Sequence, residues 1–349
     1  MDDMTAEVSQ ATGIRFVSLG MVVLDEIRLP NGEIFHDVIG GSGTYSTLGA
    51  RLVTHPSKAL EVGCFIRAGY DFPDKIKDLF RSWGIRIEIN VDEARKSTRG
   101  LLEYHDDLLN RKSFRYTTVP LQPEPRDLSP SLLLSGSFHM LLPPETLVAQ
   151  VKDLRDLRQK CQIQQSLSII WEPLPGKCTK EFLEAHRQAC NSVNIFSPNH
   201  LELLSLFGVA VADFDRSQIE KYAKELLGPG IGSYLEAIVV RAGEHGCLVV
   251  DRSSITWLPP FFQGGDHIVD TTGAGNTFLG AFAMVLERSG NLLEAAIQAT
   301  VAASFSIEQV GLAKRTATTE AGELWNNSSV TQRFGDYRDR ISKEGYSSP

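Results

Sequence analysis

The sequence predicts a single three-layer α/β domain, with a mostly parallel central sheet, helices on both faces and a small β lid. Three observations predict this fold class. The first apolar run, Ile14 to Leu19, is short and stops at Gly20, as a buried parallel strand does. Short apolar runs alternate with helical patterns, which indicates repeated βαβ units. One segment of short, charged, alternating strands interrupts the rhythm, as a separate small sheet would.

The elements follow in chain order. The first buried strand is expected at Ile14 to Leu19, and a polar alternating segment precedes a helix that opens at Gly40-Gly41 and continues through Leu52. Further strands are expected at Val62 to Ile66, Leu101 to His105, Ser113 to Tyr116, Phe138 to Leu142, Leu167 to Trp171, Val193 to Phe196, Ala237 to Val240 and Cys247 to Val250. Long helices are expected at about Phe72 to Trp83, Ala274 to Leu286 and Leu292 to Ser306.

The domain is expected to span residues 14–325, with the lid formed by about 26–38 and 85–118. Residues 1–13 are polar and acidic and are expected to be a disordered tail. Residues 326–349 are expected to be a C-terminal tail, either mobile or a surface helix. Unpaired lid strands invite pairing with another chain, so the pattern also indicates a homodimer formed through the lid.

Composition excludes several classes of protein. With 42% hydrophobic and 22% charged residues the chain has the balance of a soluble protein with a sizeable core. A net charge of −8 argues against a nucleic-acid binder. The five cysteines form no CxxC pair, which favours a reducing compartment and argues against zinc. No secretory signal, transit peptide or membrane span is recognisable, so a cytoplasmic location, or also a nuclear one, is expected by default.

The strongest local signal is the stretch from Asp270 to Phe278, DTTGAGNTF, which opens a long helix. Small residues at a helix start leave the first backbone N–H groups exposed, and these donors and the helix dipole make an anion site. Glycine accepts backbone angles closed to other residues and lets a phosphate approach the chain. The stretch therefore predicts a phosphate-binding turn made by Gly273, Ala274, Gly275 and Asn276.

This stretch resembles the C-terminal signature D-T-x-G-A-G-D of the PfkB carbohydrate-kinase family, whose members have a ribokinase-like fold. Other matches fall in the family's order between about Ile14 and Gly311. They are Gly20 followed by Asp25, the diglycine Gly40-Gly41 before a helix, Pro198-Asn199 with Glu202 (P-N-x-x-E), and Gly243 with Gly246 in a T-x-G-x-x-G turn whose threonine is here Arg241. The order of the matches carries the resemblance, because each alone also fits a turn, a helix N-cap or a solvated carboxylate.

The resemblance implies a kinase that transfers a phosphoryl group from ATP to a hydroxyl of a sugar, nucleoside or related small molecule. Asp25, Gly40 and Gly41 would hold this acceptor under the lid. The nucleotide would lie near Arg241, Gly243 and Gly246. Two groups of residues would serve cations: Asn199 and Glu202 would place Mg²⁺ through water, and Asp270 and Thr272, with carbonyls near Gly311, would form a site for a monovalent cation such as K⁺.

The sequence departs from the family signature at its last position. The family's proton acceptor is an aspartate there, and this chain has Asn276. An amide accepts a hydrogen bond but takes up no proton near pH 7. Losing a positioned general base lowers a rate by about 10²- to 10⁴-fold. The departure is shared with a divergent fungal branch of the family associated with maintenance of killer viruses, which this chain resembles.

Two functions therefore remain open. The first is a kinase that is slow or uses another carboxylate, for which Asp266 is a candidate in sequence. The second is a pseudokinase that binds nucleotide or sugar and acts as a regulatory or interaction protein. A dinucleotide dehydrogenase is excluded because no G-x-G-x-x-G follows the first strand. If only the base is missing, Asn276→Asp is expected to raise turnover by about 10²-fold.

Overall fold

The structure is a computed structural model of the chain and describes residues 13–105, 112–210, 214–228, 232, 234–319 and 322–345. Its largest element is a nine-stranded sheet in the order β13-β12-β11-β10-β9-β8-β1-β4-β5. All neighbours pair in parallel except β12 with β11 and β13 with β12, which are antiparallel at one edge. The predicted mostly parallel sheet is confirmed.

The bounds of the main elements agree with the expected ones to within a few residues. The strands of the large sheet are β1 (Phe16–Ser18), β4 (Val62–Gly69), β5 (Arg86–Asp92), β8 (Ser137–Leu142), β9 (Ser168–Pro173), β10 (Ile195–Phe196), β11 (Ala237–Arg241), β12 (Cys247–Asp251) and β13 (Ile255–Leu258). The described α-helices are α2 (Ser42–Leu52), α3 (Asp74–Ser82), α4 (Pro130–Leu133), α5 (Pro144–Lys160), α6 (Leu183–Cys190), α7 (His200–Leu206), α8 (Arg216–Leu226), α9 (Ala274–Ser289), α10 (Leu292–Ser306) and α11 (Val330–Lys343).

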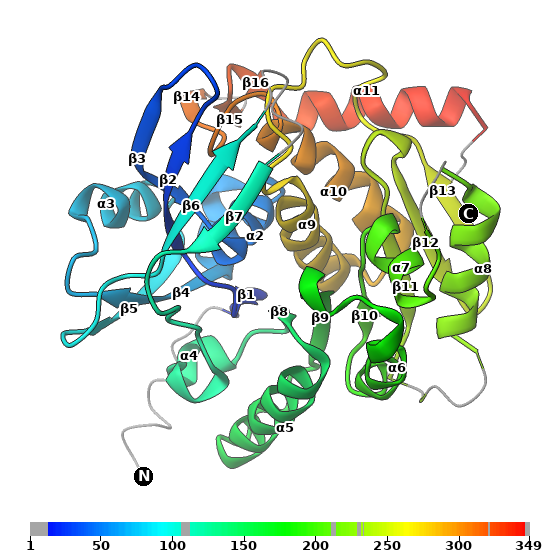
Figure 1. Ribbon diagram of the computed structural model, residues 1–349, viewed down its shortest axis with the longest axis horizontal. Helices are drawn as coiled ribbons and strands as arrows, with labels where there is room; N and C mark the ends of the chain where they lie inside the picture. Colours follow the sequence, from blue (N-terminus) through cyan, green and yellow to red (C-terminus); the bar gives the residue numbers. More distant parts are fainter. Residues whose placement is uncertain are drawn as a thin grey trace.

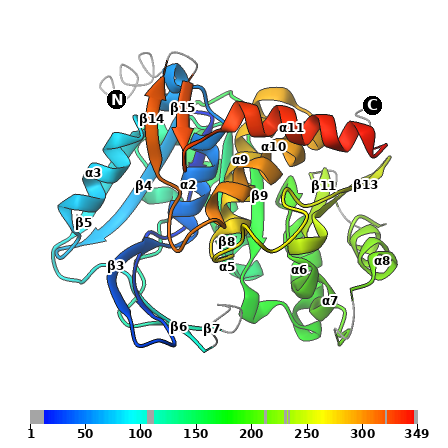
Figure 2. The same ribbon diagram turned by 90° about the horizontal axis from the view of Figure 1, so that it is seen from above.

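Helices cover both faces of the sheet (Figures 1 and 2). Successive residues of a strand point to opposite faces, so Phe16 of β1 belongs to the core under α2, α9 and α10, whereas Val17 belongs to the core under α5, α6 and α8. Both side chains are fully buried. The sheet is therefore a middle layer that is apolar on both sides, which explains why its strands read as continuous apolar runs.

Helices α2 and α9 approach each other closely because glycine lies at their crossing. A Cβ atom added at Gly280 would lie 1.8 Å from the carbonyl oxygen of Ser46, and one at Gly49 would lie 1.9 Å from that of Thr277. Both neighbours are backbone atoms, which no side-chain rotation can move away. This contact holds the N-terminal half of α9, where the predicted phosphate turn lies, against the helix that follows Gly40-Gly41.

Gly280→Ala is expected to lower the free energy of unfolding by about 3 kcal/mol, because a methyl group forced into a packed crossing moves backbone. The matched control is Gly335→Ala in α11, where an added Cβ meets nothing within 4 Å. Alanine is the better helix former by up to about 1 kcal/mol, so the control should be neutral or stabilising. Urea unfolding of both variants checks the prediction, and equal effects would contradict it.

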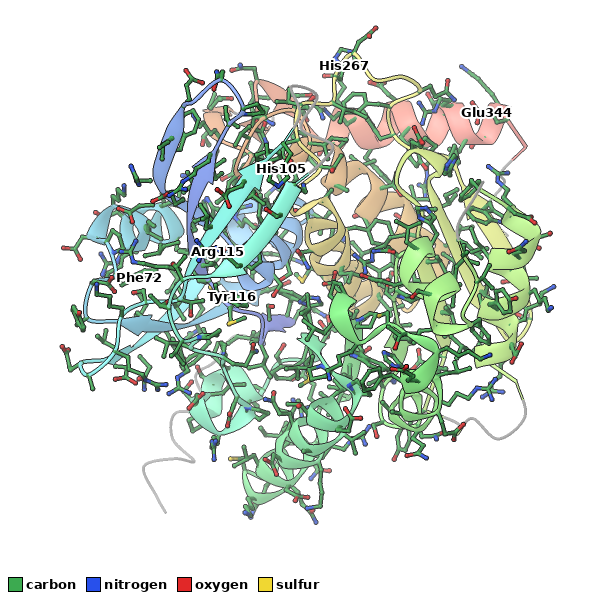
Figure 3. The ribbon with its side chains drawn as sticks, viewed as in Figure 1. Phe72, His105, Arg115, Tyr116, His267 and Glu344 are labelled. Atoms are coloured by element: carbon green, nitrogen blue, oxygen red, sulfur yellow. The ribbon has the colours of Figure 1, made fainter. Side chains whose placement is uncertain are left out.

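The chain also forms a second sheet of four strands. It has the order β3-β2-β6-β7, formed by β2 (Val23–Arg28), β3 (Ile34–Gly40), β6 (Arg99–Tyr104) and β7 (Lys112–Tyr116). The predicted small β lid is therefore present. Figure 3 shows Arg115 and Tyr116 on β7, with His105 just after β6.

The expected extent of the lid was wrong at one end. Residues 86–92 are not in the lid but form β5, the edge strand of the main sheet, which pairs in parallel with β4. Helix α3 connects β4 to β5, so these three elements make one βαβ unit. A half-buried edge strand shows the same alternating pattern as a lid strand, which is why the pattern alone misplaced it.

The chain after the last core helix is more structured than a tail. A three-stranded sheet, β14 (Arg315–Thr319), β15 (Gly322–Trp325) and β16 (Ser328–Ser329), leads into α11. Tyr337 and Ile341 of α11 are buried in the main core, so the helix alternative holds for residues 330–343. Residues 1–12, most of the expected N-terminal tail, lie outside the described residues. Within the described part of the chain, no helix combines the length and apolarity needed to cross a membrane.

Candidate active site

The predicted phosphate turn begins α9. Gly273 is the N-cap residue, with φ 79°, and an added Cβ there would meet the ring of Tyr45 at 2.4 Å. Only glycine fits both the left-handed backbone and the close ring. No side chain caps the helix, and its first turn holds no acidic residue. Among the described residues the N–H groups of Gly275 and Asn276 have no acceptor, which leaves two donors for an anion.

Asn276 contacts a carboxylate that the sequence analysis did not single out. Its Nδ2 donates to Oε2 of Glu172, which lies near the end of β9. A carboxylate only accepts hydrogen bonds, so the amide nitrogen must face Glu172 and the amide oxygen must face away from it. Glu172 and Asn276 are 104 residues apart in sequence, and the packing of α9 against the sheet brings them together.

Glu172 is the centre of a buried polar network. His139 Nε2 donates to Glu172 Oε2 at 3.1 Å, and Arg241 Nη1 donates to Oε1 at 2.8 Å. On the far side His139 Nδ1 accepts from the Ser18 hydroxyl at 3.1 Å. Burial by itself would raise the pKa of the Glu172 carboxyl, but the charge of Arg241 and the hydrogen bond from His139 outweigh it and hold that pKa below its usual value.

Arg241 joins this network to the phosphate turn. A Cβ added at Gly275 would lie 2.2 Å from Nη1 of Arg241, so the guanidinium lies directly against the first turn of α9. Its Nη2 donates to the Ser197 carbonyl at 3.0 Å and lies 3.5 Å from Glu202 Oε2. Its Nε is buried and has no acceptor within the described part of the chain. The arginine that replaces the family's threonine thus supplies a positive charge beside the anion site.

Asn199 and Glu202 form a capping box at the start of α7. Asn199 Oδ1 accepts from the Glu202 N–H at 2.8 Å, and Glu202 Oε2 accepts from the Asn199 N–H at 2.7 Å. Burial raises the pKa of Glu202, although the Arg241 charge opposes the rise. These contacts engage one oxygen of each side chain, which leaves Glu202 Oε1 for a water molecule on Mg²⁺, the role that the family resemblance implies. Across the described residues no group of three or more metal-ligating side chains occurs.

The turn between β11 and β12 also has the predicted shape. Gly243 and Gly246 have φ of 58° and 87°, and an added Cβ at Gly246 would lie 1.9 Å from the carbonyl oxygen of Leu258. At Gly243 an added Cβ would meet nothing within 4 Å, so this glycine faces open space. The turn follows Arg241 in the chain after one residue, Ala242.

Asp25 lies on β2 of the lid in a cradle made by two glycines. A Cβ at Gly40 would lie 2.2 Å from its Oδ2, and a Cβ at Gly100 would lie 2.3 Å from its Oδ1. Oδ1 is buried and has no donor among the described residues. Burial raises the pKa of Asp25 to about 7. A buried carboxylate without a donor is costly, so the cradle indicates a ligand that supplies hydroxyl donors. Gly41, with φ 91°, is the N-cap residue of α2.

Tyrosines connect the Asp25 cradle to the phosphate turn. Tyr45, which packs against Gly273, has its pKa raised by burial and then by the charges of Asp270 and Asp25. Burial likewise raises the pKa of Tyr104 and of Tyr116, and the Asp25 charge adds to both. Asp25 and the start of α9 are therefore near the same two tyrosines, Tyr45 and Tyr104, although they are far apart in sequence.

Two residues of the lid, Lys112 and Tyr104, contact the start of the stretch from Asp270 to Phe278. Lys112 Nζ donates to the Thr272 hydroxyl and lies 3.4 Å from Asp270 Oδ1, and the Tyr104 hydroxyl lies 3.2 Å from the Thr272 hydroxyl. Asp270 Oδ1 also accepts from the N–H and hydroxyl of Thr272. The side chains expected to hold a monovalent cation are thus already engaged with an ammonium group, and they do not fit a further cation at that oxygen.

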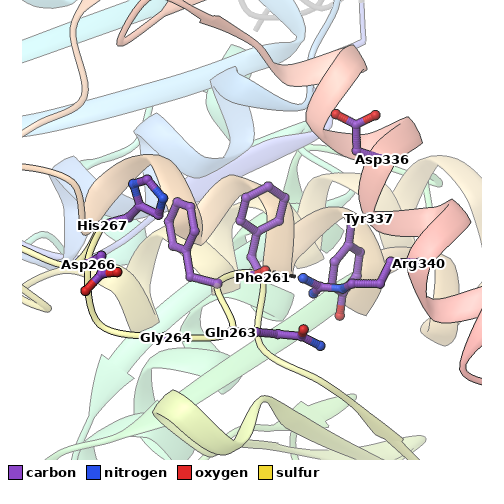
Figure 4. Close-up of a pocket in the computed structure, with 9 residues that line it drawn as sticks. Phe261, Gln263, Gly264, Asp266, His267, Asp336, Tyr337 and Arg340 are labelled. Carbon is purple, nitrogen blue, oxygen red and sulfur yellow. Dashed lines mark hydrogen bonds between the residues drawn. The ribbon is translucent and has the colours of Figure 1, made fainter.

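A separate cavity of about 490 Å³ lies behind the loop before the signature (Figure 4). Phe261, His267, Tyr337 and Arg340 line it, and Asp266 is on its rim. Asp266 is exposed, and no described hydrogen bond or ion pair joins it to Asn276. Glu172, by contrast, touches Asn276 directly, so the carboxylate that sequence proximity suggested is not the one that the fold brings to the turn.

Comparisons agree with this architecture. A protein of Giardia lamblia described as ribokinase superposes with a TM-score of 0.70 at 19% identity, covering 95% of this chain and 99% of that one. An Arabidopsis thaliana ribokinase solved with ribose and ATP superposes with a TM-score of 0.62 at 18% identity, over 86% and 95% of the two chains. The fold is therefore that of the ribokinases.

The profile of the "pfkB family carbohydrate kinase" matches residues 29–319, and the chain belongs to that family. Among curated proteins it is 32% identical to the uncharacterized protein C16C9.01c of Schizosaccharomyces pombe, over 94% of each chain. It is 26% identical to Protein MAK32 of Saccharomyces cerevisiae, over 96% of this chain and 94% of that one. These two relatives support the resemblance to a fungal branch of the family.

Sequence reasoning missed Glu172, His139, Tyr104 and Lys112. One signal for Glu172 was present: the run Trp171-Glu172-Pro173 puts an acid at the carboxyl end of a buried strand, where ligand sites of parallel sheets lie. A charged residue inside such a strand is rarely buried without a partner. His139 and Lys112 carried no comparable signal, because their partners come from other elements.

Proposed function

We propose that this chain is an ATP-dependent kinase that phosphorylates a hydroxyl of a sugar, nucleoside or related small molecule. The observation that carries the proposal is the nearness of the Asp25 cradle to the start of α9, both of which adjoin Tyr45 and Tyr104. An acceptor bound by Asp25 would present a hydroxyl toward the donors of Gly275 and Asn276, which suit a phosphoryl group. Asp25, Gly40 and Gly41 would serve the acceptor, and Arg241, Gly243 and Gly246 the nucleotide.

The protein's contribution in this proposal is positioning and charge. Phosphoryl transfer passes through a loose transition state whose negative charge spreads over the transferred oxygens. The N–H groups at the start of α9 and the guanidinium of Arg241 would stabilise that charge. Mg²⁺ would be carried by the nucleotide phosphates and held through water by Asn199 and Glu202, where it would neutralise the triphosphate. The lid would exclude water from the reacting groups.

The proposed function is tested by measuring ADP release with ATP·Mg²⁺ against a panel of sugars and nucleosides. A thermal-shift panel with the same ligands separates binding from turnover, because a ligand of the native state raises the melting temperature. Asp25→Ala should abolish the shift with the acceptor and keep the shift with ATP. Absence of binding to both ATP and every acceptor would contradict the kinase proposal.

A pseudokinase is the second candidate, and the Asn276 contact favours it. The amide is held by Glu172, so position 276 supplies no carboxylate to the acceptor hydroxyl. A chain of this kind would bind nucleotide or sugar without turnover and would act as a regulatory or interaction protein. The two candidates differ in one result: the pseudokinase binds ATP and an acceptor yet releases no ADP above the rate of a protein-free solution.

Lys112 is proposed to replace a bound K⁺. The native protein should then show the same melting temperature and ATP affinity in potassium chloride and in choline chloride. Lys112→Met should uncover the oxygens of Asp270 and Thr272, so that K⁺ stabilises the variant by about 1 kcal/mol or more once its concentration exceeds a few times the dissociation constant. Lys58→Met, at an exposed position, is the matched control. A K⁺ requirement of the native protein would refute this proposal.

The lid is also proposed to pair with the lid of a second copy of the chain. Ile34 and Phe35 of β3 and Phe114 of β7 are at least 44% exposed, and β3 and β7 are the edges of the lid sheet. Apolar side chains on unpaired edge strands favour association. Light scattering that finds only a monomer at micromolar concentration would remove this part of the proposal.

A further inference from the structure

Among the described residues, one carboxylate lies at hydrogen-bond distance from Asn276, and it belongs to Glu172. We propose that Glu172 is the catalytic residue that accepts the proton of the acceptor hydroxyl, while Asn276 positions that hydroxyl with its amide oxygen. This assignment rests on the proposed kinase function and names the residue that performs its proton transfer.

The placement of Glu172 supports the assignment. Oε1 has one donor within the described part of the chain, Arg241 Nη1, and so keeps a lone pair for a further proton. That nitrogen lies against Gly275, which places Oε1 close to the turn that would hold the transferred phosphoryl group. The Glu172 side chain is 8% exposed, so it is shielded from bulk water without being sealed off.

The contacts of Glu172 hold its carboxylate in one orientation. Gly20 N–H donates to the Ser18 hydroxyl at 3.0 Å, Ser18 faces His139 Nδ1, and His139 Nε2 donates to Glu172. Because a carboxylate has no proton to give, each donor in this chain points toward Glu172. His139 is a positioning residue in this account, since it acts through Glu172, and Arg241 orients Glu172 in addition to its proposed role at the phosphates.

The low pKa of the carboxyl is compatible with the proposed role. In the proposed step the acceptor oxygen forms a bond to the γ-phosphorus, and the bond from that phosphorus to the β,γ-bridging oxygen breaks. ADP leaves with the bond's electron pair, and the hydroxyl proton passes to Glu172, which later releases it to water. A hydroxyl becomes strongly acidic as its oxygen bonds to phosphorus, so a weakly basic carboxylate in the right place suffices, as in kinases that use aspartate.

The same geometry changes what an aspartate at position 276 would do. Asn276→Asp would place a half-buried carboxylate at hydrogen-bond distance from the buried carboxylate of Glu172, and the repulsion between two such groups strongly raises the pKa of one of them. The variant is therefore expected to lose stability as the pH rises, and not to gain the turnover that the sequence alone predicted. An exchanged pair, Glu172→Gln with Asn276→Asp, keeps one carboxylate and one amide in contact and avoids the repulsion.

The test compares Glu172→Gln, Asn276→Asp and the exchanged double variant with the native protein. Turnover is followed by ADP release, and ATP and acceptor affinities by titration. Glu172→Gln should lower kcat by about 10²-fold or more, the usual effect of a positioned base, with both affinities within about threefold of native. The double variant should recover at least about tenfold over Glu172→Gln. Asp266→Asn, a matched carboxylate-to-amide change, should leave kcat unchanged.

Each contrary result has a definite meaning. If Glu172→Gln keeps native kcat, or weakens both ligands while kcat is unchanged, Glu172 only neutralises Arg241 and the assignment is wrong. If Asn276→Asp alone raises kcat about 10²-fold, the carboxylate belongs at position 276 and the assignment is again wrong. A native protein that binds ATP and an acceptor without turnover overturns it too. A native protein that binds neither refutes the proposed function itself.

Discussion

Replacing Arg241 by methionine should lower the free energy of unfolding by about 3–5 kcal/mol, the usual loss when one partner of a buried ion pair is removed. The Arg241 and Glu172 side chains are 13% and 8% exposed, so the variant would leave the Glu172 carboxylate buried without its main compensating charge. Methionine keeps most of the packing of the arginine stem, which isolates the loss of charge. Equilibrium unfolding in urea measures the difference.

The Arg241 effect should depend on pH in a defined direction. In the native protein the pKa of Glu172 is held below its unfolded value, so its contribution to stability is present above that value and is lost as the pH falls. Without Arg241, burial raises that pKa, and protonation at acid pH relieves the unpaired charge. The difference in the free energy of unfolding between the native protein and Arg241→Met should therefore be large at pH 8 and small toward pH 4.

Two controls accompany Arg241→Met. Arg187→Met removes the ion pair with Glu225, whose side chains are 33% and 44% exposed, and should change stability by less than about 1 kcal/mol. Adding Glu172→Gln to Arg241→Met should recover part of the loss, because the charge left unpaired is then gone. Equal effects of Arg241→Met and Arg187→Met would contradict a buried compensated pair at the phosphate turn.

Replacing Asp25 by asparagine should stabilise the protein at pH 8 by about 2–4 kcal/mol. Burial raises the pKa of Asp25 from 3.8 to about 7, and each pKa unit corresponds to about 1.4 kcal/mol. Because the folded pKa is raised, the folded state binds the proton more tightly than the unfolded state does. The native protein therefore loses stability as the pH rises from about 4 to about 7 and changes little beyond that range.

Asp25→Asn removes this pH dependence and should also weaken acceptor binding. Losing a charged acceptor for a substrate hydroxyl costs about 1.5–3 kcal/mol, or roughly a 10- to 100-fold rise in dissociation constant. ATP affinity should stay within about twofold of native. The measurements are urea unfolding at pH 4, 6 and 8 and acceptor titration at pH 8. A variant that is less stable than native at pH 8 would show that Asp25 is a structural residue rather than a strained ligand group.

Local patterns in the chain suffice for the fold class and the small sheet, and they also predict the phosphate turn. Short apolar runs predict β1, β4, β8 and β9, because a strand buried on both faces has no polar face and therefore shows no alternation. The stretch from Gly273 to Asn276 predicts an anion site because helix ends expose N–H groups wherever they occur. Both inferences depend on neighbours along the chain, so no partner from elsewhere in the molecule is needed.

The sequence pattern failed where a residue's role depends on a partner distant in the chain. The alternation of β5 resembles that of a lid strand, and only its parallel pairing with β4 assigns it to the main sheet. Residues 330–343 are polar on average, and burial of Tyr337 and Ile341 against the core shows that this helix is part of the body. The positions of β5 and α11 are therefore set by their packing against the rest of the molecule.

The chemistry of the site depends on such partners most of all. From the sequence, Asn276 only shows that the family's aspartate base is absent. In the fold, its amide hydrogen-bonds the carboxylate of Glu172. Lys112 in the sequence is one lysine of a charged strand, and in the fold its ammonium meets Thr272 across 160 residues. Electrostatic interactions between charges fall with distance in space and are strengthened by burial. Neither quantity can be read from residue order, so the sequence predicts where the site lies and the tertiary structure decides which charges meet there.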